Sequence, residues 1–270
     1  MQFGKPAVMG ILNVTPDSFY DGGKYRTDRE ILARAEQILV EGGDMIDIGV
    51  VSTRPGAVLL KPDDESELLK RVVPLVRKEF GDAIVSVDTC FSAPARVAVE
   101  NGADIVNDVS GGAFDEAIFD TVASLGVPYV LMHNRTTPDR MSQAAVYGDV
   151  VGDVVLELSG KLDKLHRLGV CDVIIDLGFG FSKNMEHNYR LMASLSRIRV
   201  LFPNEPLLVA VSRKSMVYKL LDVSPDDALT GTTVLHTHAL LSGAQMLRVH
   251  DVRAACQAVT VASEIMKYVE

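Results

Sequence analysis

Short apolar segments recur along the chain and alternate with longer segments of helical period. The short segments are apolar almost throughout, which is typical of parallel strands that are buried on both faces. They lie at residues 7–12, 45–48, 84–87, 105–109, 129–132, 173–175, 207–211 and 246–249.

The segments between these strands have the period of amphipathic helices. In the clearest case, Ile31, Ala35 and Ile38 share one helix face. Thr27 precedes that helix and Glu30 follows three residues later, which is a capping-box pattern. Further helices are predicted at 64–80, 93–101, 114–125, 150–165, 184–201, 225–242 and 253–268.

The alternation predicts eight β-then-α units, the number that a (β/α)8 TIM barrel requires. A doubly wound open sheet is the alternative, but it predicts a G-x-G-x-x-G sequence after the first strand. The chain has Asn13-Val-Thr-Pro-Asp17 there, and the later Gly178-Phe-Gly180 sequence lacks the third glycine. Because no linker or change of composition divides the chain, residues 1–270 are predicted to form a single domain.

Composition narrows the classes of partner and compartment. The 270 residues are 47% hydrophobic, with 27 basic and 36 acidic side chains and a net charge of −9. That charge disfavours a nucleic-acid groove, so we expect no nucleic-acid partner. Cys90, Cys171 and Cys256 are far apart and lack C-x-x-C spacing, which suits a reducing compartment. With no signal peptide and no membrane-spanning run, the sequence predicts a cytoplasmic protein without membrane association.

Polar residues follow the predicted strands, at the end of a barrel where active sites form. Arg248 and His250 share one face of the last strand, and with Arg54 they would suit a phosphate-like anion. Arg54 could instead be a solvated loop residue, and Arg248 could pair with Asp251 at the surface. The polar strand tips are Asn13, Asp88, Asn107, Asp108, His133, Asp176, Arg213, Lys214, Arg248 and His250.

Hydrogen-bond acceptors are expected on the opposite side of this end. Buried carboxylates are costly without donors, so Asp88 and Asp176, with Asn107, favour a donor-rich ligand such as an aminopyrimidinone ring. Each could instead cap a helix. Lys214 could lie near the same ring, and Asp47 could be a satisfied carboxylate inside the barrel.

The loop after the first strand is unusually long. Asn13 ends the strand, and Thr15, Asp17 and Phe19 follow in a segment of roughly ten residues before the next helix, beyond common βα loop lengths. The segment is either a long turn with a helix cap or a loop that reaches a ligand.

Eight motifs follow one another along essentially the whole chain. They are MGILNVTPDSF (9–19), STRPGA (52–57), SVDT (86–89), IVND (105–108), MH (132–133), DLGFGF (176–181), SRKS (212–215) and RVHD (248–251). In this order they resemble the motifs of dihydropteroate synthase, the folate-pathway enzyme that sulfonamides target. The resemblance implies condensation of 7,8-dihydropterin-6-ylmethyl diphosphate with 4-aminobenzoate, through diphosphate departure to a cationic pterin methylene, in a homodimer with Mg²⁺.

The family's site roles carry over to the matching positions. The loops around Asp17 and Arg54 would close over the reacting groups, and apolar residues of the late helices (Leu235, Leu240, Val259 and Ile265) would permit dimerisation. The implied sets are Asp88, Asn107, Met132, Asp176 and Lys214 for pterin; Arg54, Arg248 and His250 for diphosphate; Thr53, Pro55, Phe181 and Ser215 for 4-aminobenzoate; Thr15, Asp17, Phe19 and Arg54 for catalysis; and Asn13 for magnesium.

Three departures from the family pattern bear on inhibition. Val50-Val51 stands where many members have Gly-Glu, Leu177 where proline is usual, and Ala210 where glycine is frequent. We expect Ala210 to add a methyl group beside the 4-aminobenzoate pocket and to alter sulfonamide affinity. A corrinoid-dependent methyltransferase barrel and a non-catalytic pterin-binding protein are the alternative functions. The methyltransferase has no use for a diphosphate site. A non-catalytic descendant would be expected to lose the residues of the first two loops, whereas Asn13, Asp17, Phe19, Thr53 and Arg54 are all present.

Overall fold

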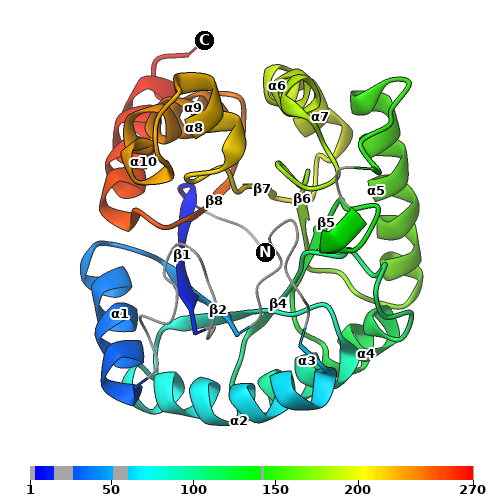
Figure 1. Cartoon of the computed structure of the whole chain (residues 1–270), viewed down its shortest axis with the longest axis vertical. Coiled ribbons are helices and arrows are strands. Elements are labelled where there is room, and N and C mark those ends of the chain that lie inside the picture. Colours follow the sequence, from blue (N-terminus) through cyan, green and yellow to red (C-terminus); the bar gives the residue numbers. More distant parts are fainter. Residues whose placement is uncertain (1–3, 15–26, 51–59, 141–142, 270) are drawn as a thin grey trace.

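The computed structural model describes residues 4–14, 27–50, 60–140 and 143–269, and in this part of the chain eight parallel strands form a closed barrel (Figure 1). Each strand pairs with its neighbour in sequence, and β8 closes the barrel against β1. The strands are β1 (Ala7–Asn13), β2 (Met45–Gly49), β3 (Ile84–Asp88), β4 (Ile105–Asp108), β5 (Tyr129–Met132), β6 (Val173–Asp176), β7 (Leu207–Val209) and β8 (Met246–Val249).

Helices form the outer ring of the barrel (Figure 1). They are α1 (Asp28–Val40), α2 (Pro62–Glu79), α3 (Ser92–Glu100), α4 (Ile118–Leu125), α5 (Val150–Arg167), α6 (Met185–Ala193), α7 (Leu195–Leu201), α8 (Ser215–Leu221), α9 (Leu229–Leu241) and α10 (Val252–Met266), with 3-10 turns η1 (Pro138–Arg140) and η2 (Pro225–Asp227). None of the helices in the described part of the chain is long and apolar enough to cross a membrane.

Alternate strand residues face the two sides of the barrel wall. Those pointing outward, such as Val8 and Ile46, pack in the large cluster beneath the helices. Those pointing inward, such as Met9, Met45 and Met246, form a separate apolar cluster inside the barrel. The interior is therefore a packed core at this level, as is usual for an eight-stranded barrel.

Strand register brings four tips to one level. Asn13 pairs with Gly49, Gly49 with Asp88, and Asp88 with Asn107. Residues on four successive strands thus form one row at the carboxyl end of the barrel, as the polar strand tips predicted.

The (β/α)8 barrel is confirmed, and the differences concern how two helices divide and one further helix. The helix predicted at 184–201 is two helices that meet at Ser194, and the one predicted at 225–242 is η2 followed by α9. Helix α8 was not predicted, because its seven residues are too few to establish a helical period. Gly126 ends α4 in the left-handed conformation, with φ 66°, which glycine adopts without strain.

Candidate functional site

A cluster of charged residues lies inside the barrel above the apolar core. Arg248 reaches from β8 to two carboxylates, with Nε 2.6 Å from Asp47 Oδ2 and Nη2 2.8 Å from Asp88 Oδ2. Asp47 is fully buried and also accepts hydrogen bonds from Asn107 Nδ2 at 3.2 and 3.3 Å. We call the set of Asp47, Asp88, Asn107, Asp176, Lys214 and Arg248 the polar layer.

Asp88 is the member with an unmet hydrogen-bonding need. Its Oδ1 is buried and has no hydrogen-bond partner among the described residues. Burial raises the pKa of Asp88 to about 7, although the charge of Arg248 opposes the shift. A buried carboxylate oxygen that lacks a donor is costly, so this atom is suited to accept a hydrogen bond from a ligand.

Asp176 and Lys214 form the other side of the polar layer. Asp176 Oδ1 accepts a hydrogen bond from Gly178 N at 2.8 Å, and burial raises the pKa of this carboxyl. Lys214 Nζ donates to Phe179 O at 2.6 Å and lies 4.7 Å from the centre of the Phe181 ring. Burial lowers the pKa of Lys214 to about 8, while the charge of Asp176 acts in the opposite direction.

The polar layer thus contains three carboxylates and two cationic side chains. If all of them are ionised, the layer has a net charge of −1, which favours a ligand with several donor groups or a partial positive charge. Met132 and the ring of Phe181 belong to a small apolar cluster with Cys90 and Val109. Acceptors beside an apolar wall are suited to a flat ring whose edge carries hydrogen-bond donors.

The rim of the barrel holds the remaining described candidates. Asn13 is half-buried at the tip of β1, and a Cβ added at Gly49 would lie 3.1 Å from its Oδ1, so glycine keeps the space beside this oxygen open. The backbone of His250 binds Ser212 Oγ through its N–H and Arg34 Nη2 through its carbonyl. Ser215 is the first residue of α8, next to Lys214.

Comparison with known proteins decides the family. The sequence model for pterin binding enzymes matches residues 9–250. The dihydropteroate synthase of Streptococcus pyogenes is 40% identical over 269 residues, which cover 97% of each chain. The chain belongs to the dihydropteroate synthase family of pterin-binding enzymes.

Solved structures of this family have the same fold as this chain over nearly its whole length. The Yersinia pestis dihydropteroate synthase in complex with a sulfonamide drug is 35% identical with a TM-score of 0.93, covering 100% of this chain and 97% of that one. The Xanthomonas albilineans enzyme with 4-aminobenzoic acid is 36% identical with a TM-score of 0.88, covering 99% and 95%. All of these relatives are named dihydropteroate synthase, so the comparison supports neither of the two alternative functions, a methyltransferase or a non-catalytic binding protein.

The structure brings together the residues that the resemblance in sequence implied for pterin, whose role stays a prediction. Asp88, Asn107, Asp176 and Lys214 lie in the polar layer, and Met132 is in the adjacent apolar cluster. Six other predicted site residues lie outside the described part of the chain, so their placement stays a prediction. These are Thr15, Asp17, Phe19, Thr53, Arg54 and Pro55.

Arg248 lies among the acceptors, whereas the sequence grouped it with His250 on an anion site opposite them. Its long side chain compensates two buried carboxylates, which would otherwise be costly. The alternative pair with Asp251 is wrong, because Asp251 binds Arg213 Nη2 at 2.6 Å and Nε at 2.9 Å.

The helix-cap alternative for Asp88 is also wrong. The amide of Ser92, at the start of α3, is bound by Asp115 Oδ2 at 2.7 Å, and Asp88 instead faces Arg248. Sequence reasoning gave Asp47 little weight, although its alternation with Met45 and Gly49 on β2 places it on the inward face. Sequence reasoning did not single out Glu157 and Lys183, which both bind His133 outside the polar layer.

Proposed function

We propose that this chain condenses 7,8-dihydropterin-6-ylmethyl diphosphate with 4-aminobenzoate, giving 7,8-dihydropteroate and diphosphate. The observation that carries the proposal is the buried Oδ1 of Asp88, which has no hydrogen-bond partner among the described residues. The pterin ring presents a row of N–H donors on its pyrimidine edge. Asp88 and Asp176 accept hydrogen bonds from this edge, Asn107 contributes its amide, and Lys214 binds a ring acceptor.

The diphosphate and the metal belong at the rim. Arg54, His250 and the outer side of Arg248 bind the leaving group, because guanidinium groups match phosphate oxygens. The described residues contain no cluster of three or more His, Cys, Asp or Glu side chains that could hold a metal. Asn13 supplies one oxygen beside the open space at Gly49. This fits Mg²⁺, which is often held by few protein ligands together with phosphate oxygens and water.

The reaction breaks the bond between the pterin methylene carbon and the diphosphate oxygen, and the electron pair leaves with diphosphate. The nitrogen of 4-aminobenzoate then attacks the cationic methylene and loses a proton, which passes to solvent once the loops open. Arg54, Arg248 and His250 stabilise the departing charge, while Mg²⁺ adds further neutralisation when bound. Thr15, Asp17 and Phe19, with Thr53 and Pro55, close over the reacting atoms and exclude water. Phe181 and Ser215 contact 4-aminobenzoate.

A diphosphate-release assay tests this function. The purified chain should release one diphosphate per dihydropteroate formed, with a requirement for both Mg²⁺ and 4-aminobenzoate for sustained turnover. Asp17→Ala should reduce turnover at least tenfold and leave pterin binding intact, because we expect Asp17 to stabilise the cation or orient the amine. Absence of diphosphate release under all conditions would overturn the function, and unchanged turnover in Asp17→Ala would remove the role of that residue.

We also propose a cytoplasmic homodimer that forms through the late helices. Free cysteines at 90, 171 and 256 suit a reducing compartment. Leu240 and Val259 lie in the core, so they do not offer the dimer surface that the sequence suggested. Exposed apolar residues of α8, α9 and α10 are better candidates, among them Leu220, Val234 and Val261. Sedimentation should give about twice 29.3 kDa, and a monomer would exclude the dimer.

A further inference from the structure

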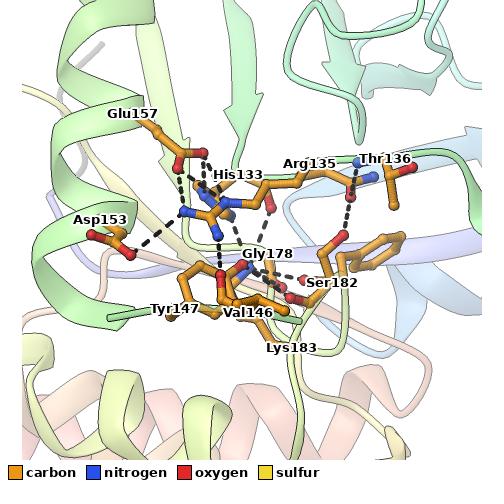
Figure 2. Close-up of polar contacts among 12 residues, drawn as sticks. His133, Arg135, Thr136, Val146, Tyr147, Asp153, Glu157, Gly178, Ser182 and Lys183 are labelled. Carbon is orange, nitrogen blue, oxygen red and sulfur yellow. Dashed lines mark hydrogen bonds and ion pairs between the residues drawn. The ribbon is translucent and has the colours of Figure 1, made fainter. Parts of the chain in front are cut away.

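A network of charged and aromatic side chains lies between helix α5 and the loop 177–184, which follows β6 and is called here the β6 loop. Figure 2 shows Glu157 and Asp153 on α5, with Lys183 and Ser182 on the opposite side and His133 and Arg135 between them. The network does not bind either substrate in the proposed reaction. It does contact the loop that carries Phe181.

Lys183 is the centre of this network. The residue is only 9% exposed, and its Nζ lies 3.0 Å from each of three atoms: Gly178 O, Phe181 O and His133 Nδ1. Two of these acceptors belong to the β6 loop itself, and the third is at the end of β5. A fourth contact, from Nζ to His133 O, is longer at 3.4 Å, so the three short contacts match the three N–H donors of the ammonium form. Burial lowers the pKa of Lys183 to about 7, while the charge of Asp176 acts in the opposite direction.

The neighbours of His133 decide the direction of these hydrogen bonds. Hydrogen bonds from His133 and Arg135 lower the pKa of Glu157 to about 2, so this carboxylate is ionised and can only accept. Burial lowers the pKa of His133 to about 4, so the ring is neutral and has one N–H. His133 Nε2 lies 2.9 Å from Glu157 Oε2 and therefore carries that hydrogen. Nδ1 is then an acceptor, and Lys183 must donate to it.

Further contacts fix the same loop. Tyr147 donates to Ser182 O at 3.0 Å, and Ser182 Oγ binds Asn134 Oδ1 at 2.9 Å. Ser182 has φ 50°, a left-handed conformation that is costly for a residue with a side chain. At Gly178, with φ 68°, an added Cβ would lie 2.0 Å from His133 O. The β6 loop therefore has a strained, close-packed conformation that needs these contacts.

The loop conformation determines the position of two proposed substrate-binding groups. Phe179 O accepts the hydrogen bond of Lys214 Nζ, and the Phe181 ring lies beside the same ammonium group. We propose that Lys183, oriented by the His133–Glu157 pair, is a positioning residue that holds the β6 loop so that Phe181 and Lys214 meet the substrates. This inference rests on the proposed function, and it assigns to Lys183 no contact with substrate.

Lys183→Met tests the proposal, because it keeps an unbranched side chain that is shorter only by the terminal nitrogen and so removes the ammonium group. Amide exchange of the peptide covering 177–184 should become at least tenfold faster, since Gly180 N and Phe181 N lose the geometry of their bonds to Asn188 Oδ1 and Gly178 O. KM for 4-aminobenzoate should rise at least fivefold, with kcat changed less than threefold. Exchange and KM that both match the unmodified chain would overturn the proposal.

Arg77→Met is the matched control. Arg77 also binds several loop carbonyls, those of Gly81, Ala83 and Gly102, but it does so near the amino ends of β3 and β4. This variant should lose thermal stability and leave both exchange of 177–184 and KM unchanged. If it raises KM as much as Lys183→Met, the effect is one of general stability and the proposal fails.

Tyr147→Phe is the second test of the proposal, to be used if Lys183→Met does not fold. It removes one hydrogen bond to Ser182 O and should shift exchange and KM in the same direction by about twofold to threefold, whereas no change in either would contradict the proposal. If the unmodified chain releases no diphosphate, the proposed function fails. Amide exchange, which needs no activity, then decides the role of Lys183 by itself.

Discussion

At the residue scale, buried carboxylates dominate the electrostatics of this protein. Asp88 is close to Arg248, but Glu65 on α2 is 1% exposed and its Oε1 has no hydrogen-bond partner within the described residues. Burial raises the pKa of Glu65 to about 7, a hydrogen bond from Thr89 acts against the shift, and the charges of Asp88 and Asp108 add to it. Folding therefore favours the protonated form of Glu65.

Glu65→Gln should remove a pH-dependent cost. A carboxyl whose folded pKa lies above the unfolded value of 4.5 binds more protons in the folded state, so its contribution to stability falls as the pH rises toward 7. The variant should therefore gain stability relative to the unmodified chain between pH 5 and pH 8, by roughly 1–3 kcal/mol. Urea unfolding at the two pH values measures the difference. Glu67→Gln, at an exposed position of the same helix, should show no such gain.

At the element scale, the position of Ala210 just after β7 determines which residues its methyl group contacts. Leu208 on β7 pairs with Asp176 on β6, and Ala210 lies two residues further on the same inward face, in the interior cluster with Met246. Phe181 belongs to a different cluster. The methyl group therefore lies in the interior cluster and not in the cluster of Phe181, so we expect it to affect the pterin more than 4-aminobenzoate or a sulfonamide.

Ala210→Gly should raise KM for the pterin substrate about fourfold, because one buried methyl contact contributes roughly 0.8 kcal/mol. The sulfonamide inhibition constant should stay within twofold of that of the unmodified chain. Steady-state kinetics with each substrate varied in turn, and with a sulfonamide as competitor, measures both effects. A shift confined to the inhibition constant would restore the original expectation.

At the scale of the whole molecule, Arg248 links elements from opposite ends of the chain. Asp47 is 201 positions away in sequence and Asp88 is 160 positions away, yet both contact one guanidinium group. Burial alone would lower the pKa of Arg248, but the charges of Asp47 and Asp88 raise it, so this residue stays charged. The charge balance of the barrel interior thus depends on one side chain of the last strand.

Arg248→Met should destabilise the fold by about 3–5 kcal/mol at pH 8, because two buried carboxylates lose their counterion. The loss should be smaller at pH 5, since Asp88 already has a raised pKa and is protonated more readily without the guanidinium group. Urea unfolding at the two pH values checks the sign. Arg190→Met, which breaks an exposed pair with Glu186, should cost less than about 1 kcal/mol at either pH. Equal losses in the two variants would contradict this account.

The sequence by itself determined the alternation of strands and helices, the single barrel and the end of the barrel where polar residues gather. These are local properties: residue period, capping patterns such as Thr27 with Glu30, and the position of a side chain relative to the end of its strand. The motifs were also local enough to identify the family.

Only the tertiary structure decided which charges meet. Sequence spacing places Asp88 and Arg248 at strand ends, but it cannot say that β8 closes on β1 in a register that lets Arg248 reach β2 and β3. In the same way, His133 and Lys183 are 50 positions apart and become partners only where the ends of β5 and β6 lie side by side. Pairing between distant side chains depends on strand register and burial, which are properties of the folded barrel.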